Sequence, residues 1–209
     1  RPVARALPRG HGRRHRLRHP GRRHPPGKSV AGIEVPNPER EEIVLRDLVE
    51  ISSAKSDAYK LPMCLGRDTE GKPVIEDLSK MPHLLVGGAT SMGKSVLVNS
   101  MLTGLLCKFS PKDLRLIIVD PKLVEFKIYE DIPHLLLPIV NDAVDASKAL
   151  KWAVNETKKR YQKMQEIAAK NLEAYNLKAS EKAEDPEQQL ERFPYIVVII
   201  DELAELMLT

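Results

Sequence analysis

The sequence predicts an α/β protein with a mainly parallel β-sheet. Two apolar runs, LRLIIVD at 114–120 and YIVVII at 195–200, have the composition of parallel strands that helices cover on both faces. Helical patterns lie beside and between these runs, and strands that alternate with helices are typical of this fold class. At 209 residues and 42% hydrophobic content, the chain has enough apolar side chains to bury a core.

Residues 27–80 predict a lead-in segment with short strands and a helix. The run SVAGIEVP at 29–36 alternates weakly and predicts a strand that Pro36 ends. The apolar spacing in 39–51 predicts a short amphipathic helix. In 61–78 two strand-like stretches flank the turn signal at 68–71, which predicts a pair of short strands.

Residues 81–209 predict the main domain. The run HLLVG at 83–87 predicts a buried strand, and the apolar spacing of 94–109 predicts a helix packed on a sheet. The longest helical pattern runs from 142 to about 170. Its predicted apolar stripe consists of Ala146, Leu150, Ala153, Val154, Tyr161, Met164 and Ala168. The polar stretch 176–193 predicts an exposed loop or a frayed helix, and 203–208 predicts a short final helix.

The charge is divided unevenly along the chain. Residues 1–33 carry nine arginines and Lys28 but no acid, whereas residues 34–209 carry all 29 acids against 23 bases, a net charge of −6. The basic balance of the whole chain therefore says nothing about nucleic-acid binding by its body. No uncharged apolar run approaches the roughly 18 residues of a membrane-spanning helix. We therefore expect no membrane contact from these 209 residues themselves.

Residues 1–26 form an atypical basic segment of arginine, histidine, proline and glycine. It fits a basic arm that contacts phosphates, a disordered tail with nothing to bury, or a GC-rich gene read out of frame. The composition becomes ordinary at about residue 27, so the predicted divisions are 1–26, 27–80 and 81–209.

A phosphate-binding loop is predicted between the strand-like run 83–87 and the helix that follows it. The residues Gly88, Ala89, Thr90, Ser91, Met92, Gly93, Lys94 and Ser95 fit the pattern G-x-x-x-x-G-K-[ST]. The bend directs backbone N–H groups to one point, and the helix adds its positive end. In such a loop Lys94 neutralises the β- and γ-phosphates and the Ser95 hydroxyl coordinates Mg²⁺. The alternative is an ordinary glycine turn between a strand and a helix.

Two acids at the end of the last apolar run complete the predicted site. The run 195–200 delivers Asp201 to the tip of a strand, with Glu202 beside it. Asp201 is predicted to hold Mg²⁺, and Glu202 to orient or deprotonate the attacking water. Acids are common at strand ends, so this prediction depends on the phosphate loop that precedes it.

Several stretches together resemble the motor domain of the FtsK/SpoIIIE DNA translocases, in order, from about Pro26 to the end of the chain. They include PGKSVAGIEVPN, LPMCLGRDTEGKPV, HLLVGGATSMGKSV, VDPK, IPHLL, ALKWAVNETKKRYQKM, NLEAYN and PYIVVIIDELAELM. The resemblance implies a RecA-like P-loop NTPase core, here incomplete at the C-terminus. It also implies an ATP-driven, Mg²⁺-dependent hexameric ring that moves double-stranded DNA, attached to the cytoplasmic face of the membrane at the division septum.

Two other readings stay open beside the DNA translocase. One is a related hexameric ATPase of conjugation or secretion, and the other is a fragment that only binds nucleotide. The resemblance also extends to Asp120, Lys122 and Glu125, whose role is structural or catalytic. For His134 we expect a packed or hydrogen-bonded side chain.

Arg160 has two interpretations, and the phosphate loop departs from the family at one position. Arg160 either reaches a neighbour's γ-phosphate in a ring or forms a solvent-facing ion pair with Glu156; we favour the ion pair. The family usually has glycine where Ser91 stands. If that position needs a positive φ, serine costs about 1 kcal/mol there.

Overall fold

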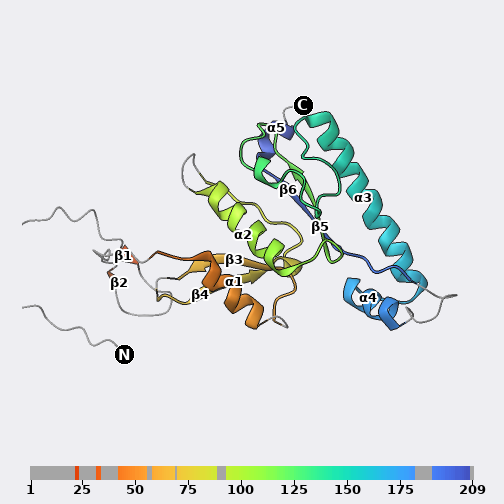
Figure 1. Cartoon of the computed structure of the whole chain (residues 1–209), viewed down its shortest axis with the longest axis horizontal. Coiled ribbons are helices and arrows are strands. Elements are labelled where there is room, and N and C mark those ends of the chain that lie inside the picture. Colours follow the sequence, from red (N-terminus) through yellow and green to blue (C-terminus); the bar gives the residue numbers. More distant parts are fainter. Residues whose placement is uncertain are drawn as a thin grey trace, which may run out of the picture. The chain divides into compact units, whose positions relative to one another are not determined.

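The computed structural model describes residues 22–23, 32–33, 42–55, 58–68, 70–88, 93–181 and 190–207 (Figure 1). The chain divides into two compact units, Arg1–Glu42 and Ile43–Thr209. In the first unit, β1 (Arg22–Arg23) pairs antiparallel with β2 (Gly32–Ile33). The rest of the basic segment 1–26 and most of the predicted strand at 29–36 lie outside the described residues. The predicted divisions after residues 26 and 80 stay predictions.

The second unit begins with a helix and a hairpin. Helix α1 (Leu45–Ala54) is followed by β3 (Pro62–Arg67) and β4 (Pro73–Asp77), which pair antiparallel, and by a 3₁₀ turn η1 (Leu78–Lys80). The pair of short strands is thus confirmed. The helix begins later than predicted because Val44 is extended and more than half exposed, so the first apolar residues of the pattern do not pack as a helical face.

The main sheet is parallel. Strand β5 (Leu114–Val119) pairs with β6 (Tyr195–Ile200) from Leu114 opposite Tyr195 to Val119 opposite Ile200. Along the other edge of β5, the irregular segment 134–140 runs in the same direction and bonds to Leu116 and Val119 through two isolated bridges. Strand β5 is therefore central, and the predicted mainly parallel sheet is confirmed.

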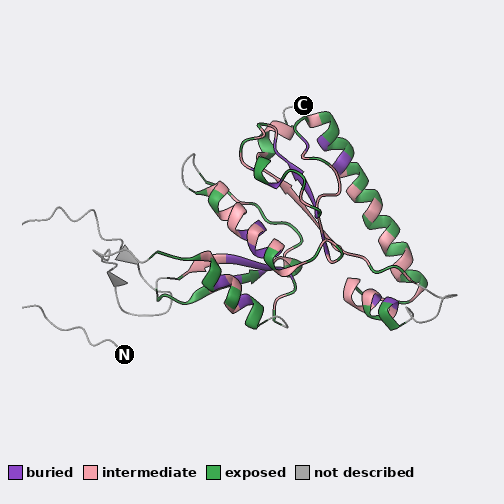
Figure 2. Cartoon of the chain, viewed as in Figure 1, coloured by how far each residue is buried: buried purple, intermediate pink, exposed green. Residues whose placement is uncertain are grey.

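Helices cover both faces of β5. Side chains alternate along a strand, so Leu116 and Ile118 lie on one face and Val119 on the other. The first face packs on Leu102 and Leu105 of α2 (Lys94–Lys108). The second face packs on Ala146 of α3 (Ala143–Glu166). These two layers explain why β5 is almost wholly buried (Figures 1 and 2).

Helix α3 starts where the sequence predicts but buries a different stripe. The Asp142 carboxylate caps it by accepting a hydrogen bond from the Asp145 amide, 2.9 Å away. Of the predicted stripe, Val154 and Tyr161 are 55% and 65% exposed, so their placement in the core was wrong. The helix has only one turn of close packing, through Ala146 and Ala149, and the remainder is half-buried or exposed.

Three shorter helical elements complete the unit. They are η2 (Lys127–Tyr129), α4 (Leu172–Glu181) and α5 (Leu203–Met207). Helix α4 includes the start of the polar stretch at 176–193, because Tyr175 is 1% exposed and stacks on Phe193 with ring centroids 4.4 Å apart. Within the described residues, no helix is long and apolar enough to cross a bilayer.

The predicted buried strand at 83–87 was wrong. The segment has no strand partner among the described residues, and Leu84 and Leu85 are 44% and 82% exposed. A strand forms only when its backbone groups pair with a neighbouring strand. Within the described residues β6 pairs with β5 along one edge, and 83–87 pairs with neither of these strands.

Candidate functional site

The candidate site lies at the carboxyl ends of β5 and β6. Asp120 directly follows β5 and Asp201 directly follows β6, and the parallel pairing brings them to the same edge of the sheet. The Asp201 amide donates to the Val119 carbonyl at 3.0 Å, which extends the ladder by one bond. Ligands of open α/β sheets bind at this edge, outside the carboxyl ends of the strands.

The first residue of α2 reaches this edge. Lys94 Nζ donates to the Asp201 carbonyl oxygen at 2.8 Å and lies 3.1 Å from the Asp201 carboxylate oxygen Oδ1. The Lys94 side chain is 29% exposed and that of Asp201 only 9%. Two residues that are 107 positions apart in the sequence therefore form one largely buried ion pair.

Glycine is required at the entrance to α2. Gly93 is the N-cap of the helix and has φ +84°, a left-handed conformation that side chains disfavour. Gly88 is exposed and Ser95 is half-buried in the first turn of α2. The other predicted loop residues, Ala89, Thr90, Ser91 and Met92, lie outside the described residues.

Lys122 occupies the space beside Glu202. Its Nζ lies 3.1 Å from Glu202 Oε2 and 2.9 Å from Glu205 Oε1, where Glu205 belongs to α5. Hydrogen bonds to Glu205 and then Glu202 raise the pKa of Lys122 above its ordinary value, so the ammonium stays charged. Sequence reasoning missed Glu205. The signal is its spacing, because Glu205 lies in the helix predicted directly after Glu202.

Asp120 is a buried acid with a structural task. Its side chain is fully buried, and Oδ2 accepts hydrogen bonds from the amides of Glu125 and Phe126 at 3.1 and 3.0 Å. Its Oδ1 is buried and has no hydrogen-bond partner in the structure. Asp120 thus closes the turn that carries Lys122, while Glu125 contributes its backbone amide to the same turn.

The structure places His134 and Arg160 in structural roles. His134 is 9% exposed and its Nε2 lies 2.9 Å from the Phe109 carbonyl, which confirms a packed and hydrogen-bonded histidine. Arg160 pairs with Glu156 at 2.8 Å, which confirms the ion pair. The pair is largely buried rather than solvent-facing, because Arg160 also donates to the Pro194 carbonyl and stacks over Phe193.

A divalent cation fits the residues beside Lys94. Ser95 and Asp201 offer a hydroxyl and a carboxylate, hard oxygen donors of the kind that Mg²⁺ takes, usually with phosphate and water oxygens as its other ligands. In the part of the chain that the structure describes, no group of three or more His, Cys, Asp or Glu could hold a metal without such help.

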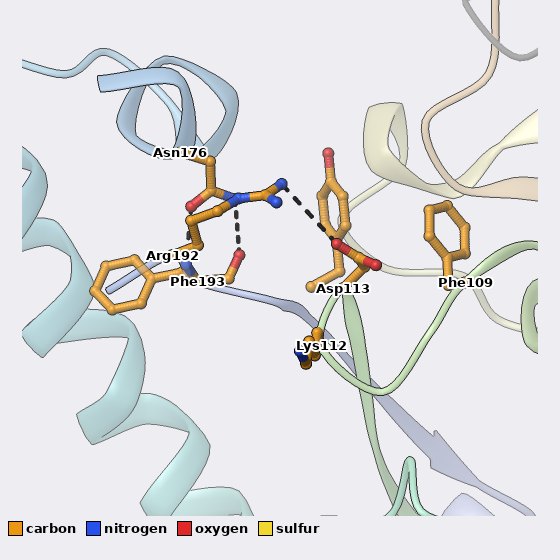
Figure 3. A pocket seen from close by; sticks show the side chains of 7 residues that line it. Phe109, Lys112, Asp113, Asn176, Arg192 and Phe193 are labelled. Atoms are coloured by element: carbon orange, nitrogen blue, oxygen red, sulfur yellow. Dashed lines mark hydrogen bonds and ion pairs between the residues drawn. The ribbon is translucent and has the colours of Figure 1, made fainter. Parts of the chain in front are cut away.

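A separate cavity of about 290 Å³ lies at the opposite end of β5 and β6 (Figure 3). It is lined by Phe109, Lys112, Asp113, Asn176, Arg192, Phe193 and Tyr195. Asp113 precedes β5 and Asp120 follows it, and a six-residue strand spans about 20 Å. Arg192 and Asp113 pair across the cavity at 3.9 Å. This cavity is therefore distinct from the site around Lys94 and Asp201.

Comparison with solved structures identifies the fold. The conjugation coupling protein TcpA of pCW3, solved as a monomer with ATPγS, is 31% identical, with a TM-score of 0.55 over 70% of this chain and 36% of that one. The cytoplasmic domain of the Thermomonospora curvata type VII secretion ATPase EccC is 27% identical, with a TM-score of 0.55 over 71% of this chain and 18% of that one. The fold is that of P-loop NTPase motor domains, and the RecA-like core is confirmed.

Comparison with curated sequences identifies the family. The DNA translocase FtsK of Rickettsia bellii is 43% identical over 88% of this chain, and that of Clostridium tetani is 46% identical over 88%. The chain spans about a quarter of the length of these relatives. The sequence model of the FtsK/SpoIIIE family matches residues 44–209. The chain therefore belongs to the FtsK/SpoIIIE family.

Proposed function

We propose that this chain binds ATP with Mg²⁺ in the cradle of Gly88–Ser95 and hydrolyses it as part of a motor that translocates double-stranded DNA. The observation that carries the proposal is the contact between Lys94 and Asp201. A phosphate loop works only when its lysine and the acid of the neighbouring strand face one ligand. Here both side chains lie at one edge of the sheet.

Each side chain of the site has a distinct task in this proposal. Lys94 leaves Asp201 and binds the β- and γ-phosphates of ATP. The N-terminus of α2 directs its free N–H groups at the same phosphates. Ser95 and Asp201 hold Mg²⁺, which supplies charge neutralisation across the phosphate oxygens when bound. Glu202 accepts a hydrogen bond from the attacking water and orients it in line with the γ-phosphate.

The proposed substrate is double-stranded DNA, because the relatives that match 88% of this chain are named DNA translocases. We extend this proposal to a hexameric ring that acts in chromosome segregation at cell division. We also place the parent protein at the cytoplasmic face of the cell membrane at the division septum. These extensions rest on family membership.

Steady-state ATP hydrolysis, with and without linear double-stranded DNA, tests the proposal. We expect duplex DNA to raise the hydrolysis rate, and the Glu202→Gln variant to lose hydrolysis while it retains nucleotide binding. The Lys148→Met variant is a matched control, because Lys148 forms an exposed ion pair with Asp145 at the start of α3. A rate of ATP hydrolysis that is the same with and without duplex DNA would contradict the translocase assignment.

A second candidate function is a motor of conjugation or secretion. The observation that favours it is the 31% identity to the conjugation coupling protein TcpA, together with the likeness to the secretion ATPase EccC. Hydrolysis that duplex DNA does not stimulate, but that single strands or a protein substrate do, would favour this candidate. Nucleotide binding without any turnover would leave a nucleotide-binding module.

A further inference from the structure

Among the described residues, the side chain that bonds to Glu202 is that of Lys122. Lys122 lies in the turn after β5, whereas Glu202 follows β6. Lys122 lies 80 positions before Glu202 in the sequence. It also binds Glu205 of α5 at 2.9 Å, so one ammonium bridges two carboxylates. The bridge joins the turn after β5 to the acids that follow β6.

The bridge from Lys122 lies in a region with an excess of negative charge. Asp201, Glu202 and Glu205 place three carboxylates within five residues, and Lys94 is already paired with Asp201. Glu202 directly precedes α5 and Glu205 lies within it, and both carboxylates reach the same ammonium, so their like charges lie close together and repel. The Glu202 side chain is 43% exposed, so without a cation beside it the carboxylate would turn into solvent. Lys122 opposes this repulsion.

Hydrogen bonds to Asp120 and a buried phenylalanine fix the turn that carries Lys122. Asp120 binds the amides of Glu125 and Phe126, and the Leu123 amide donates to the Asp120 carbonyl at 3.1 Å. Phe126 is 1% exposed and anchors the end of the turn in the core. A long flexible lysine is thus attached to a firmly fixed backbone, which restricts where its ammonium can reach.

We infer that Lys122 is a positioning residue for nucleotide hydrolysis, which holds the Glu202 carboxylate in the orientation that aligns the attacking water. The inference rests on the proposed function, since it needs ATP in the cradle. It assigns Asp120 and Lys122 separate tasks: Asp120 builds the turn, and Lys122 reaches from it to Glu202. In this inference Lys122 acts through Glu202 rather than on the phosphates or the water directly.

The test compares the binding of ADP with the binding of ADP–aluminium fluoride, a mimic of the transferring phosphoryl group with its attacking water. Both are measured with Mg²⁺ by calorimetry on this chain. Lys122→Met should weaken the affinity for the fluoride complex about fivefold, the upper end of what an exposed ion pair contributes, and should change the ADP affinity less than about twofold. Lys122→Arg should restore most of the loss, because it keeps the charge.

Three further variants make the result decisive. Lys148→Met removes another exposed ion-paired lysine, from α3, and should leave both affinities unchanged. Glu202→Gln should lower the affinity for the fluoride complex, and adding Lys122→Met to it should lower that affinity no further, because both changes remove one interaction. Additive losses would overturn the inference, as would equal weakening of ADP and of the fluoride complex.

The inference and the proposed function fail in different ways. If Lys94→Ala abolishes ADP binding but Lys122→Met leaves the affinity for the fluoride complex unchanged, the nucleotide site stands and the role of Lys122 is refuted. If ADP binding does not depend on Lys94 at all, the proposed function is refuted and the role of Lys122 falls with it.

Discussion

The Asp201→Asn substitution should change nucleotide affinity in opposite directions with and without Mg²⁺. Asp201 holds Lys94 through its carboxylate at 3.1 Å and through its backbone carbonyl at 2.8 Å. A phosphate group must compete with this carboxylate for the lysine. Asparagine removes the negative charge but keeps the size of the side chain and the carbonyl contact, so the substitution isolates the charge.

The size of the effect follows from the geometry. Two unit charges 3.1 Å apart attract by about 5 kcal/mol at an effective dielectric constant of 20. Desolvation and the 29% exposure of Lys94 offset most of this, which leaves a net attraction of about 1 kcal/mol. Without Mg²⁺ the variant should therefore bind a slowly hydrolysed ATP analogue about fivefold more tightly.

With Mg²⁺ the Asp201→Asn variant should instead bind the analogue more weakly than the wild type does, because the cation loses a charged ligand. The assay is a titration of this analogue in EDTA and again in Mg²⁺, and the quantity compared is the ratio of the two affinities. Asp145→Asn, an exposed acid paired with Lys148, is the matched control. Weaker binding of the Asp201→Asn variant in EDTA would refute the reasoning, as would an unchanged Mg²⁺ ratio.

Three further predictions concern the framework of the site. Burial alone would raise the pKa of Asp77, which is 3% exposed, but four hydrogen bonds from Lys60, Leu61 and Ser79 outweigh this effect and lower the pKa from 3.8 to about 2. Its carboxylate stabilises the fold by about 2 kcal/mol above pH 4, a contribution lost toward pH 2. Urea denaturation should show this loss in the wild type but not in Asp77→Asn, and equal pH dependence would contradict it. Leu102→Ala, at a 1% exposed core position, should lower the free energy of unfolding by about 3 kcal/mol in the same assay; a loss below about 1 kcal/mol would count against the described core. Gly93→Ala should lower the free energy of unfolding by about 1 kcal/mol in the same assay, because its Cβ would meet no atom within 4 Å and only the positive φ opposes it; an unchanged free energy of unfolding would contradict the left-handed conformation of Gly93.

Much of the architecture could be read from local patterns. The runs that became β5 and β6 were identified by their unbroken apolar composition, and α2 by the glycine and lysine that precede its apolar residues. Lys94 and Asp201 could be assigned to one site in advance, because a phosphate loop needs a metal-holding acid at the end of a neighbouring strand. These features depend on few residues and on rules that hold in many folds.

The elements that sequence patterns misplaced depend on contacts between distant parts of the chain. The run at 83–87 has the sequence of a buried strand, but Leu85 is 82% exposed because no described strand lies beside it. Tyr161 fits the helical period of α3 but lies beyond the turn that contacts Val119. The bridge from Lys122 to Glu202 joins residues 80 positions apart, and no local pattern encodes it.

The most direct test of the central claim is calorimetric binding of Mg²⁺–ATPγS to the wild-type chain and to Lys94→Ala. The account predicts one binding site in the wild type, and a loss of about 2 kcal/mol or more in the variant, equivalent to at least about a thirtyfold weaker affinity. Circular dichroism should show both proteins equally folded. Equal affinity of the two folded proteins, or no binding by the folded wild type, would contradict the claim that Lys94 and Asp201 face a nucleotide phosphate.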